Sequence, residues 1–156
     1  MSNALNEVAQ CFVAQWDDKP VAFHAVLPLP NGKLNNAMRA SRTVVLPDYQ
    51  GLGIGSTLSD TVAGIYKNNG LTVYTKTVNP ALGLHRDKSP LWEPTTHNHK
   101  TRNLDGFQDN NGRHYLGRPS YCHKYVGPPV QGFDNLILPI DKIRRIRGLE
   151  GQLSLF

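Results

Sequence analysis

Cysteine is scarce in this sequence of 156 residues, in which Cys11 and Cys122 are the only two. They form no CxxC pair, and the six histidines do not follow the regular spacing of a zinc module. The adjacent Cys122 and His123 leave a metal site open as an alternative. The pattern predicts no metal site, with structural or accidental roles for both thiols.

Long apolar runs are also absent. Asn3, Asn6 and Glu7 stand where a signal peptide would need an apolar stretch, and no later run reaches membrane-spanning length. We therefore expect no membrane partner and a cytoplasmic location, in which both cysteines are reduced.

Acidic residues are in deficit, because 12 Asp and Glu stand against 17 Lys and Arg, a formal net charge of +5. This charge favours an anionic partner such as nucleic acid or a phosphorylated cofactor, without choosing between them. Hydrophobic residues at 39% and charged residues at 19% are typical of a globular protein. The length suits one domain rather than two, so we expect a single domain over residues 1–156.

What the sequence does contain is a succession of strand, glycine-rich loop, helix and strand. Short apolar runs bounded by prolines predict strands at 21–27 and 42–46, with 33–41 between them as a loop or a short helix. A strand rich in β-branched residues follows at 71–78. A crossover of this kind predicts an α/β fold with parallel or mixed strand pairing.

The helix between these strands is indicated by apolar residues at helical spacing, namely Leu58, Val62, Ile65 and Tyr66. Ser56 or Thr57 is the expected N-cap, and Asn69-Gly70 is the expected stop. Polar residues dominate 80–118, which predicts a long ordered loop or a short helix near 82–86. Further strands are expected at 121–126 and 133–140, before a basic terminal segment at 141–156.

The chemistry of the sequence centres on residues 50–56, Gln-Gly-Leu-Gly-Ile-Gly-Ser. Small residues at the start of a helix expose successive backbone N–H groups beside the positive end of the helix dipole, so a pyrophosphate fits there. The motif is not a P-loop, because no Gly-Lys-Ser/Thr ends it. It is not the dinucleotide-binding fingerprint either, because Ser56 stands where that fingerprint needs its third glycine. The remaining pattern is Gln-x-x-Gly-x-Gly, and a glycine-rich turn needed only for packing is the alternative.

Residues 44–55 resemble the cofactor motif of the GNAT acetyltransferases, which is Gln/Arg-x-x-Gly-x-Gly/Ala after a strand that commonly ends in a proline-containing turn. The resemblance reaches from about residue 21 to residue 86. It implies a GNAT-like mixed central sheet flanked by helices, N-acetyltransferase activity, and acetyl-CoA or another acyl-CoA as cofactor. Main-chain groups near Val45 would bind the pantetheine arm and thioester carbonyl. The implied cofactor-binding residues are Val44, Val45, Leu46, Gln50, Gly51, Leu52, Gly53, Ile54, Gly55, Ser56 and Asn79.

Catalysis needs a base for the amine nucleophile and an acid for the departing thiolate. Members of the family place a tyrosine acid about two helical turns beyond the asparagine that Asn79 matches, and here His85 or Arg86 stands in that neighbourhood. His85 could donate the proton, or could simply be solvated. Ser89 could act through its hydroxyl or start a turn, and Tyr74 lies where some relatives keep a glutamate. Asp48, Glu93, His24 and a water relay are further alternatives for the base.

A second resemblance involves residues 42–50 and 88–92, which are similar to a group of phage and bacterial GNAT proteins related to Mom-type DNA-modifying enzymes. It implies the transfer of an acyl or acyl-like group to a base in DNA, or to an amine already attached to such a base. If the chain is phage-encoded, the expected location is the host cytoplasm. The cationic residues expected to contact nucleic acid are Lys100, Arg102, Lys142, Arg144, Arg145 and Arg147. A solubilising surface is the alternative for them. Acetylation of a small molecule or protein, and a nucleic-acid-binding module without catalysis, are the competing functions.

Overall fold

The computed structural model describes residues 8–29, 33–34, 36–101, 117–133 and 137. Two helices and seven strands occur in these ranges, with a short 3-10 helix at Pro47–Tyr49. In chain order they are β1 (Gln10–Trp16), β2 (Lys19–Pro28), β3 (Ala37–Val45), α1 (Ile54–Asn68), β4 (Thr72–Thr77), α2 (Pro80–Lys88), β5 (Trp92–Pro94), β6 (Lys100–Thr101) and β7 (Pro119–Tyr125).

The strands form one mixed sheet in the order β1-β2-β3-β4-β7-β5, with β6 paired to β7. Strands β3 and β4 are parallel because the chain crosses between them through α1, whereas the other neighbouring strands are antiparallel. The predicted α/β fold with a mixed sheet flanked by helices is therefore confirmed. No helix in the described ranges is long and apolar enough to cross a membrane.

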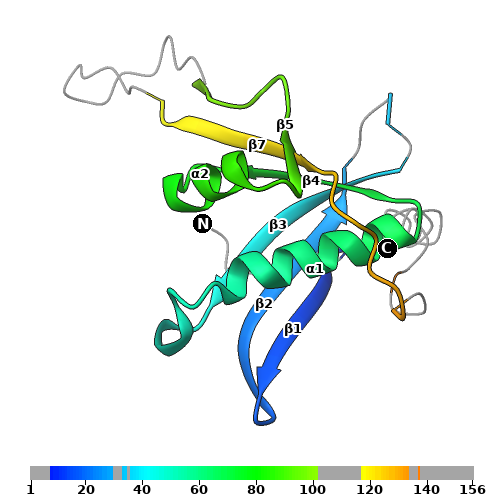
Figure 1. The fold of residues 1–156 in the computed structure, drawn as a ribbon, viewed down its shortest axis with the longest axis vertical. Coiled ribbons are helices and arrows are strands. Elements are labelled where there is room, and N and C mark those ends of the chain that lie inside the picture. Colours follow the sequence, from blue (N-terminus) through cyan, green and yellow to red (C-terminus); the bar gives the residue numbers. More distant parts are fainter. Residues whose placement is uncertain (1–7, 30–32, 35, 102–116, 134–136, 138–156) are drawn as a thin grey trace, which may run out of the picture.

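Helix α1 covers one face of β1, β2 and β3, whereas α2 lies beside β7 (Figure 1). Val62, Ile65 and Tyr66 are buried because their helical spacing directs them to the same face. They pack against Val26 and Met38 of the sheet in the main core cluster. The core thus fixes α1 on the sheet and, with it, the position of the glycine-rich loop at the start of α1.

Strands β3 and β4 pair only where both begin, through Ala37–Arg39 and Thr72–Tyr74. In β3, Ala40 and Arg42 pair with successive residues of β2, so Ser41 is an extra residue. Such a bulge bends a strand and increases its twist. Beyond it β3 continues beside β2 alone, while β4 continues beside β7, and the two strands part to form a cleft.

Several sequence predictions need correction. Residues 33–41 were expected to form a loop or a short helix, yet β3 begins at Ala37 because Ala37 and Met38 are buried between two neighbouring strands. Helix α1 begins at Ile54, with Gly53 rather than Ser56 or Thr57 as its N-cap. Strand β1 had no counterpart in the prediction.

The region 80–118 contains more structure than a long loop. The short helix expected near 82–86 is confirmed as part of α2, which extends from Pro80 to Lys88, and β5 and β6 follow it. In the strand expected at 133–140, residues 134–136 and 138–140 lie outside the described ranges, as does the basic segment 141–156.

Candidate functional site

The glycine-rich loop follows the end of β3 and turns the chain into α1. Gly51 and Gly53 have φ angles of 82° and 77°, the left-handed region that favours glycine. The Gln50 side chain donates from Nε2 to the carbonyl oxygen of Val45 at 3.0 Å. This bond ties the loop back to the strand and explains why a glutamine precedes the glycines.

The N-terminus of α1 leaves backbone donors without partners in the helix. Its first helical hydrogen bond runs from the N–H of Thr57 to the oxygen of Gly53 at 3.0 Å. The N–H groups of Ile54, Gly55 and Ser56 come before this bond and therefore have no acceptor within the helix. Gly53 supplies no capping side chain. A Cβ on Gly55 would lie 3.0 Å from Cγ2 of Val45, so glycine allows close packing on β3. Unpaired donors and the helix dipole together favour an anion here.

Where β3 and β4 part, a cavity of about 240 Å³ opens. Its lining comes from both strands and from α2: Ala40, Ser41, Arg42, Thr43, Thr75, Lys76, Thr77, Asn79, Leu82 and Arg86. Asn79 is the N-cap of α2, and its Oδ1 accepts from the N–H of Ala81 at 2.9 Å. This cap uses Oδ1 and leaves the side-chain Nδ2 of Asn79 available to a ligand. We refer to this hollow as the cleft cavity.

Arg86 places a cation in the cleft cavity although its side chain is only 3% exposed. Its Nη2 donates to Oγ of Ser59 at 2.9 Å, and its Cζ lies 4.7 Å from the ring centre of Trp92. Burial lowers the pKa of Arg86 to about 10, against the opposing effect of the Asp60 charge. The guanidinium therefore remains charged at neutral pH and can stabilise a developing anion.

His24 lies in the same region on β2 and is fully buried. Its Nδ1 is 2.7 Å from Oγ1 of Thr43, which lines the cleft cavity. Burial, followed by the charge of Arg86, lowers the pKa of His24 to about 4. The imidazole is therefore neutral at physiological pH and serves as a hydrogen-bonding partner for Thr43 rather than as a cation.

On the other side of α2, Asp87 binds two histidines. Its Oδ1 lies 2.8 Å from Nε2 of the buried His123, and its Oδ2 lies 3.0 Å from Nε2 of the exposed His99. Burial alone would raise the pKa of Asp87, but hydrogen bonds from Asn98 and His123 and the nearby imidazoles hold it below its ordinary value. In the described ranges no group of three or more His, Cys, Asp or Glu could hold a metal ion.

A second hollow, of about 560 Å³, is lined by β3, β4, β7 and the segment after β5. Its lining residues are Leu29, Leu34, Arg39, Tyr74, Thr75, Lys76, Thr95, Thr96, His97 and Cys122. Thr75 and Lys76 belong to this lining and to that of the cleft cavity. We call it the acceptor cavity, and it adjoins the cleft cavity through these two shared residues of β4.

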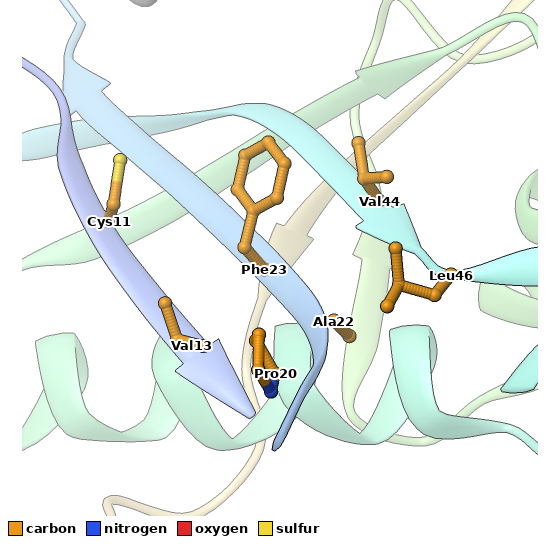
Figure 2. A pocket seen from close by; sticks show the side chains of 7 residues that line it. All are labelled: Cys11, Val13, Pro20, Ala22, Phe23, Val44 and Leu46. Carbon is orange, nitrogen blue, oxygen red and sulfur yellow. The ribbon is translucent and has the colours of Figure 1, made fainter. Parts of the chain in front are cut away.

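An apolar hollow of about 360 Å³ lies on the sheet face turned away from α1, and Figure 2 shows its side chains with the helix behind the strands. Its lining residues are Cys11, Val13, Pro20, Ala22, Phe23, Val44 and Leu46. No charged side chain lines it, so it has little means of orienting a polar reactant. Val44 and Leu46 point into this hollow (Figure 2), so their side chains are turned away from the cleft, and the backbone N–H of Leu46 donates to the oxygen of Val21 on β2 at 2.9 Å.

The predicted catalytic residues occupy three different places. His85 is exposed on α2 and is not among the residues lining the cleft cavity, whereas the next residue, Arg86, is. Ser89 is the C-cap of α2, and its Oγ accepts from the N–H of Leu91 at 3.3 Å. Tyr74 is half-buried and lines the acceptor cavity. Trp92, which follows the Ser89 segment, is 4% exposed and lies in the core cluster.

Of the cations predicted to contact nucleic acid, Lys100 is exposed on β6. The others lie outside the described residues, namely Arg102, Lys142, Arg144, Arg145 and Arg147.

Sequence reasoning did not assign roles to Arg86 or Asp87. Its spacing had already placed Arg86, with His85, near the position of the family's tyrosine, because it follows Asn79 by seven residues, about two turns of helix. No comparable signal existed for Asp87, since its partners His99 and His123 come from the segment before β6 and from β7.

Comparisons with known proteins agree with the fold. Residues 7–87, more than half of the chain, match the family model of the acetyltransferase (GNAT) domain. The ribosomal-protein-S18-alanine N-acetyltransferase of Escherichia coli has a similar fold, with a TM-score of 0.53 and 17% identity over 86% of this chain and 77% of that one. A comparison with curated protein sequences finds no significant match.

Two further solved structures contain the cofactor or its product. A Bacillus subtilis acetyltransferase in complex with CoA has a TM-score of 0.55 and 17% identity over 76% of this chain and 77% of that one. A GNAT family acetyltransferase from Elizabethkingia anophelis with acetyl-CoA bound has a TM-score of 0.55 and 16% identity over 76% of each chain. At these identities the similarity concerns the fold.

Proposed function

Because the chain belongs to the GNAT acetyltransferase family, we propose that it binds acetyl-CoA, or another acyl-CoA, in the cleft between β3 and β4 and transfers the acyl group to an amine. The observation that carries the proposal is the open N-terminus of α1, where left-handed Gly51 and Gly53 precede unpaired N–H groups beside the cleft. Relatives with CoA and acetyl-CoA bound support the choice of cofactor.

In this proposal the pyrophosphate binds the N–H groups of residues 51–56, and the pantetheine arm follows the open edge of β3. The N–H of Leu46 donates to Val21 of β2. Because main-chain groups alternate in direction along a strand, those of Val45 point to the opposite edge, toward the cleft. The amide nitrogen of Asn79 is a further donor for the arm.

The acyl transfer itself needs the neutral amine nitrogen to attack the thioester carbonyl, which forms the C–N bond. The C–S bond then breaks, and the proton that the nitrogen loses is taken up, directly or through water, by the leaving thiolate. We assign Arg86 to the leaving thiolate, because a charged guanidinium that is itself buried and lines the cavity stabilises an anion strongly. His85, the acid predicted from the sequence, remains the competing assignment. Thr75 and Lys76 stand where the acyl group and the amine would meet.

Binding of acetyl-CoA is tested by its effect on the melting temperature of two variants, Gly53→Asp and Gly53→Asn. Only Oγ of Ser56, at 3.9 Å, approaches a Cβ at this position, and both side chains strain the same φ angle. The pair therefore differs mainly in charge. Acetyl-CoA should raise the melting temperature of the wild type and of Gly53→Asn, and Gly53→Asp should lose most of this shift. Equal shifts in all three proteins would remove the cofactor assignment.

The acceptor amine distinguishes three functions: modification of a base in DNA, acetylation of a small molecule or protein, and nucleic-acid binding without catalysis. CoA release from acetyl-CoA should be measured with and without duplex DNA, together with DNA binding at several salt concentrations. Each phosphate contact contributes about 0.9 to the log–log salt slope. Replacing Lys142, Arg144, Arg145 and Arg147 with Gln should flatten the slope if they contact DNA. An affinity indifferent to salt would contradict the electrostatic argument for DNA.

A further inference from the structure

Among the described residues, every charged side chain that lines the acceptor cavity is positive. Arg39 and Lys76 are exposed cations on β3 and β4, His97 adds an imidazole, and no Asp or Glu lines the cavity. A volume of about 560 Å³ is within the usual range of small-molecule sites. A cationic amine would gain no carboxylate partner here and would be repelled by two like charges.

The cavity also offers an aromatic surface next to one of its cations. Tyr74 is half-buried, and Arg39 is its direct partner in the parallel pairing of β3 with β4. Both residues line the cavity, so a planar ring against Tyr74 would have its substituents within reach of the Arg39 guanidinium. Guanidinium groups bind carboxylate and phosphate through paired hydrogen bonds.

Lys76 lines both cavities and therefore lies close to the point of transfer. An amine must be neutral to attack a thioester, and a nearby cation lowers the pKa of an amine because it disfavours the charged form. A positive lining thus favours the neutral nucleophile. The binding free energy must then come from another part of the acceptor, and an anionic group supplies it.

We infer that the acceptor is an amine attached to a planar ring that bears an anionic group, a carboxylate or a phosphate, with the ring against Tyr74 and the anion at Arg39. This inference rests on the proposed acyl transfer, in which the acceptor would lie beside the cleft cavity, with which the acceptor cavity shares the lining residues Thr75 and Lys76. A nucleotide carrying an amine on its base belongs to this class, and so does an aromatic amino acid derivative.

Three benzylamines of nearly equal size test the inference: 4-(aminomethyl)benzoate, its neutral amide 4-(aminomethyl)benzamide, and the dication 1,4-bis(aminomethyl)benzene. Their affinities for the CoA-bound protein are measured by calorimetry, which does not depend on turnover. The benzoate should bind about tenfold more tightly than the amide, as expected for one charge-assisted hydrogen bond, and the dication should bind most weakly. A nucleoside and its 5′-monophosphate, both carrying a 5-aminomethyl group on uracil, compare phosphate with carboxylate as the anion.

The variant Arg39→Gln should reduce the preference for the benzoate over the amide to about threefold or less, because it removes the charge-assisted hydrogen bond to the carboxylate. Lys19→Gln, which removes an exposed cation outside the cavity lining, should leave the preference unchanged. Equal affinities for the three benzylamines, preference for the dication, or binding of none of them would overturn the inference. If acetyl-CoA still raises the melting temperature in that case, the proposed acyl-CoA function stands and only the acceptor class is wrong.

Discussion

The guanidinium of Arg86 donates a hydrogen bond of 2.9 Å to the hydroxyl of Ser59 and thereby joins α2 to α1 inside the core. Trp92 completes the junction, since it lies under the guanidinium and donates from Nε1 to Asp60 at 2.8 Å. Because Arg86 also lines the cleft cavity, one cation serves the packing of two helices and the electrostatics of the site.

Replacing Arg86 with Gln should reduce turnover far more than it reduces cofactor affinity. A lost electrostatic donor to a developing anion lowers kcat by about 10²- to 10³-fold. The same change removes the cation above Trp92, which contributes about 0.5–2 kcal/mol to stability. Steady-state kinetics and acetyl-CoA binding, both below the melting temperature of the variant, separate these effects. A variant with wild-type kcat would exclude Arg86 from the reaction.

His85→Ala is the matched variant, one residue earlier on α2. His85 is exposed and outside the lining of the cleft cavity, so its loss should change kcat less than about threefold if Arg86 stabilises the thiolate. If His85 is the general acid, the result is reversed: kcat falls while acetyl-CoA affinity is retained. The two variants together decide which residue acts on the leaving group.

Acid should destabilise the protein through His24. The pKa of this histidine is about 4 when folded, because of burial and the Arg86 charge, against 6.5 in the unfolded chain. Its contribution to stability is therefore complete above pH 6.5 and is lost progressively as the pH falls toward 4. The difference corresponds to about 3 kcal/mol. Urea unfolding between pH 7.5 and 4.5 should show a smaller loss of stability for His24→Gln than for wild type, whereas the exposed-site variant His97→Gln should follow wild type.

Thr75→Val should leave stability unchanged or raise it by about 1 kcal/mol, because Oγ1 of Thr75 is buried and has no hydrogen-bond partner among the described residues. The substitution keeps the shape of the side chain. As Thr75 lines both cavities, we expect turnover to fall by about tenfold, the effect of losing one hydrogen bond to a reactant. Thr75→Ser should keep most of the activity, and a Val variant with full turnover would confine the residue to packing.

Gly83 should tolerate no side chain at all. A Cβ at this position of α2 would lie 2.0 Å from Cγ of the Tyr121 ring on β7. Overpacking of this kind destabilises a protein by about 1–3 kcal/mol, so Gly83→Ala should lower the urea midpoint. In a Tyr121→Ala background the same substitution should cost much less, and equal costs in both backgrounds would show that the ring is not the obstacle.

The sequence was most informative where local chemistry determines the backbone. The glycine-rich loop could be predicted because left-handed Gly51 and Gly53 and the apolar stripe of α1 depend on nearby residues alone. Strand β1 escaped prediction because residues such as Cys11, Phe12 and Val13 are apolar in succession, which hides the alternation of a strand. Both faces of the sheet are apolar here, since Cys11 and Val13 line the apolar hollow on the face turned away from α1 (Figure 2).

The remaining features depend on residues that are distant in the sequence. The first half of β3 contains no β-branched residue and is a strand because β2 and β4 pair with it on both sides. Likewise the contacts of Arg86 with Ser59 and of Asp87 with His123 require the packing of α2 between α1 and β7. These contacts join residues far apart in the chain, so the spacing of residues along the sequence cannot predict them.

The three-residue pairing of β3 with β4 has a mechanical consequence. Among the described residues, the strand pairing between the two halves of the sheet is confined to Ala37–Arg39 and Thr72–Tyr74, and beyond it side chains rather than a hydrogen-bond ladder set the separation of β3 and β4. Under the proposed function, a thioester would enter between the strands without breaking any strand pairing. Before it arrives, the backbone amides of β4 that face β3 beyond Tyr74 should exchange their hydrogens with solvent faster than those directed toward β7.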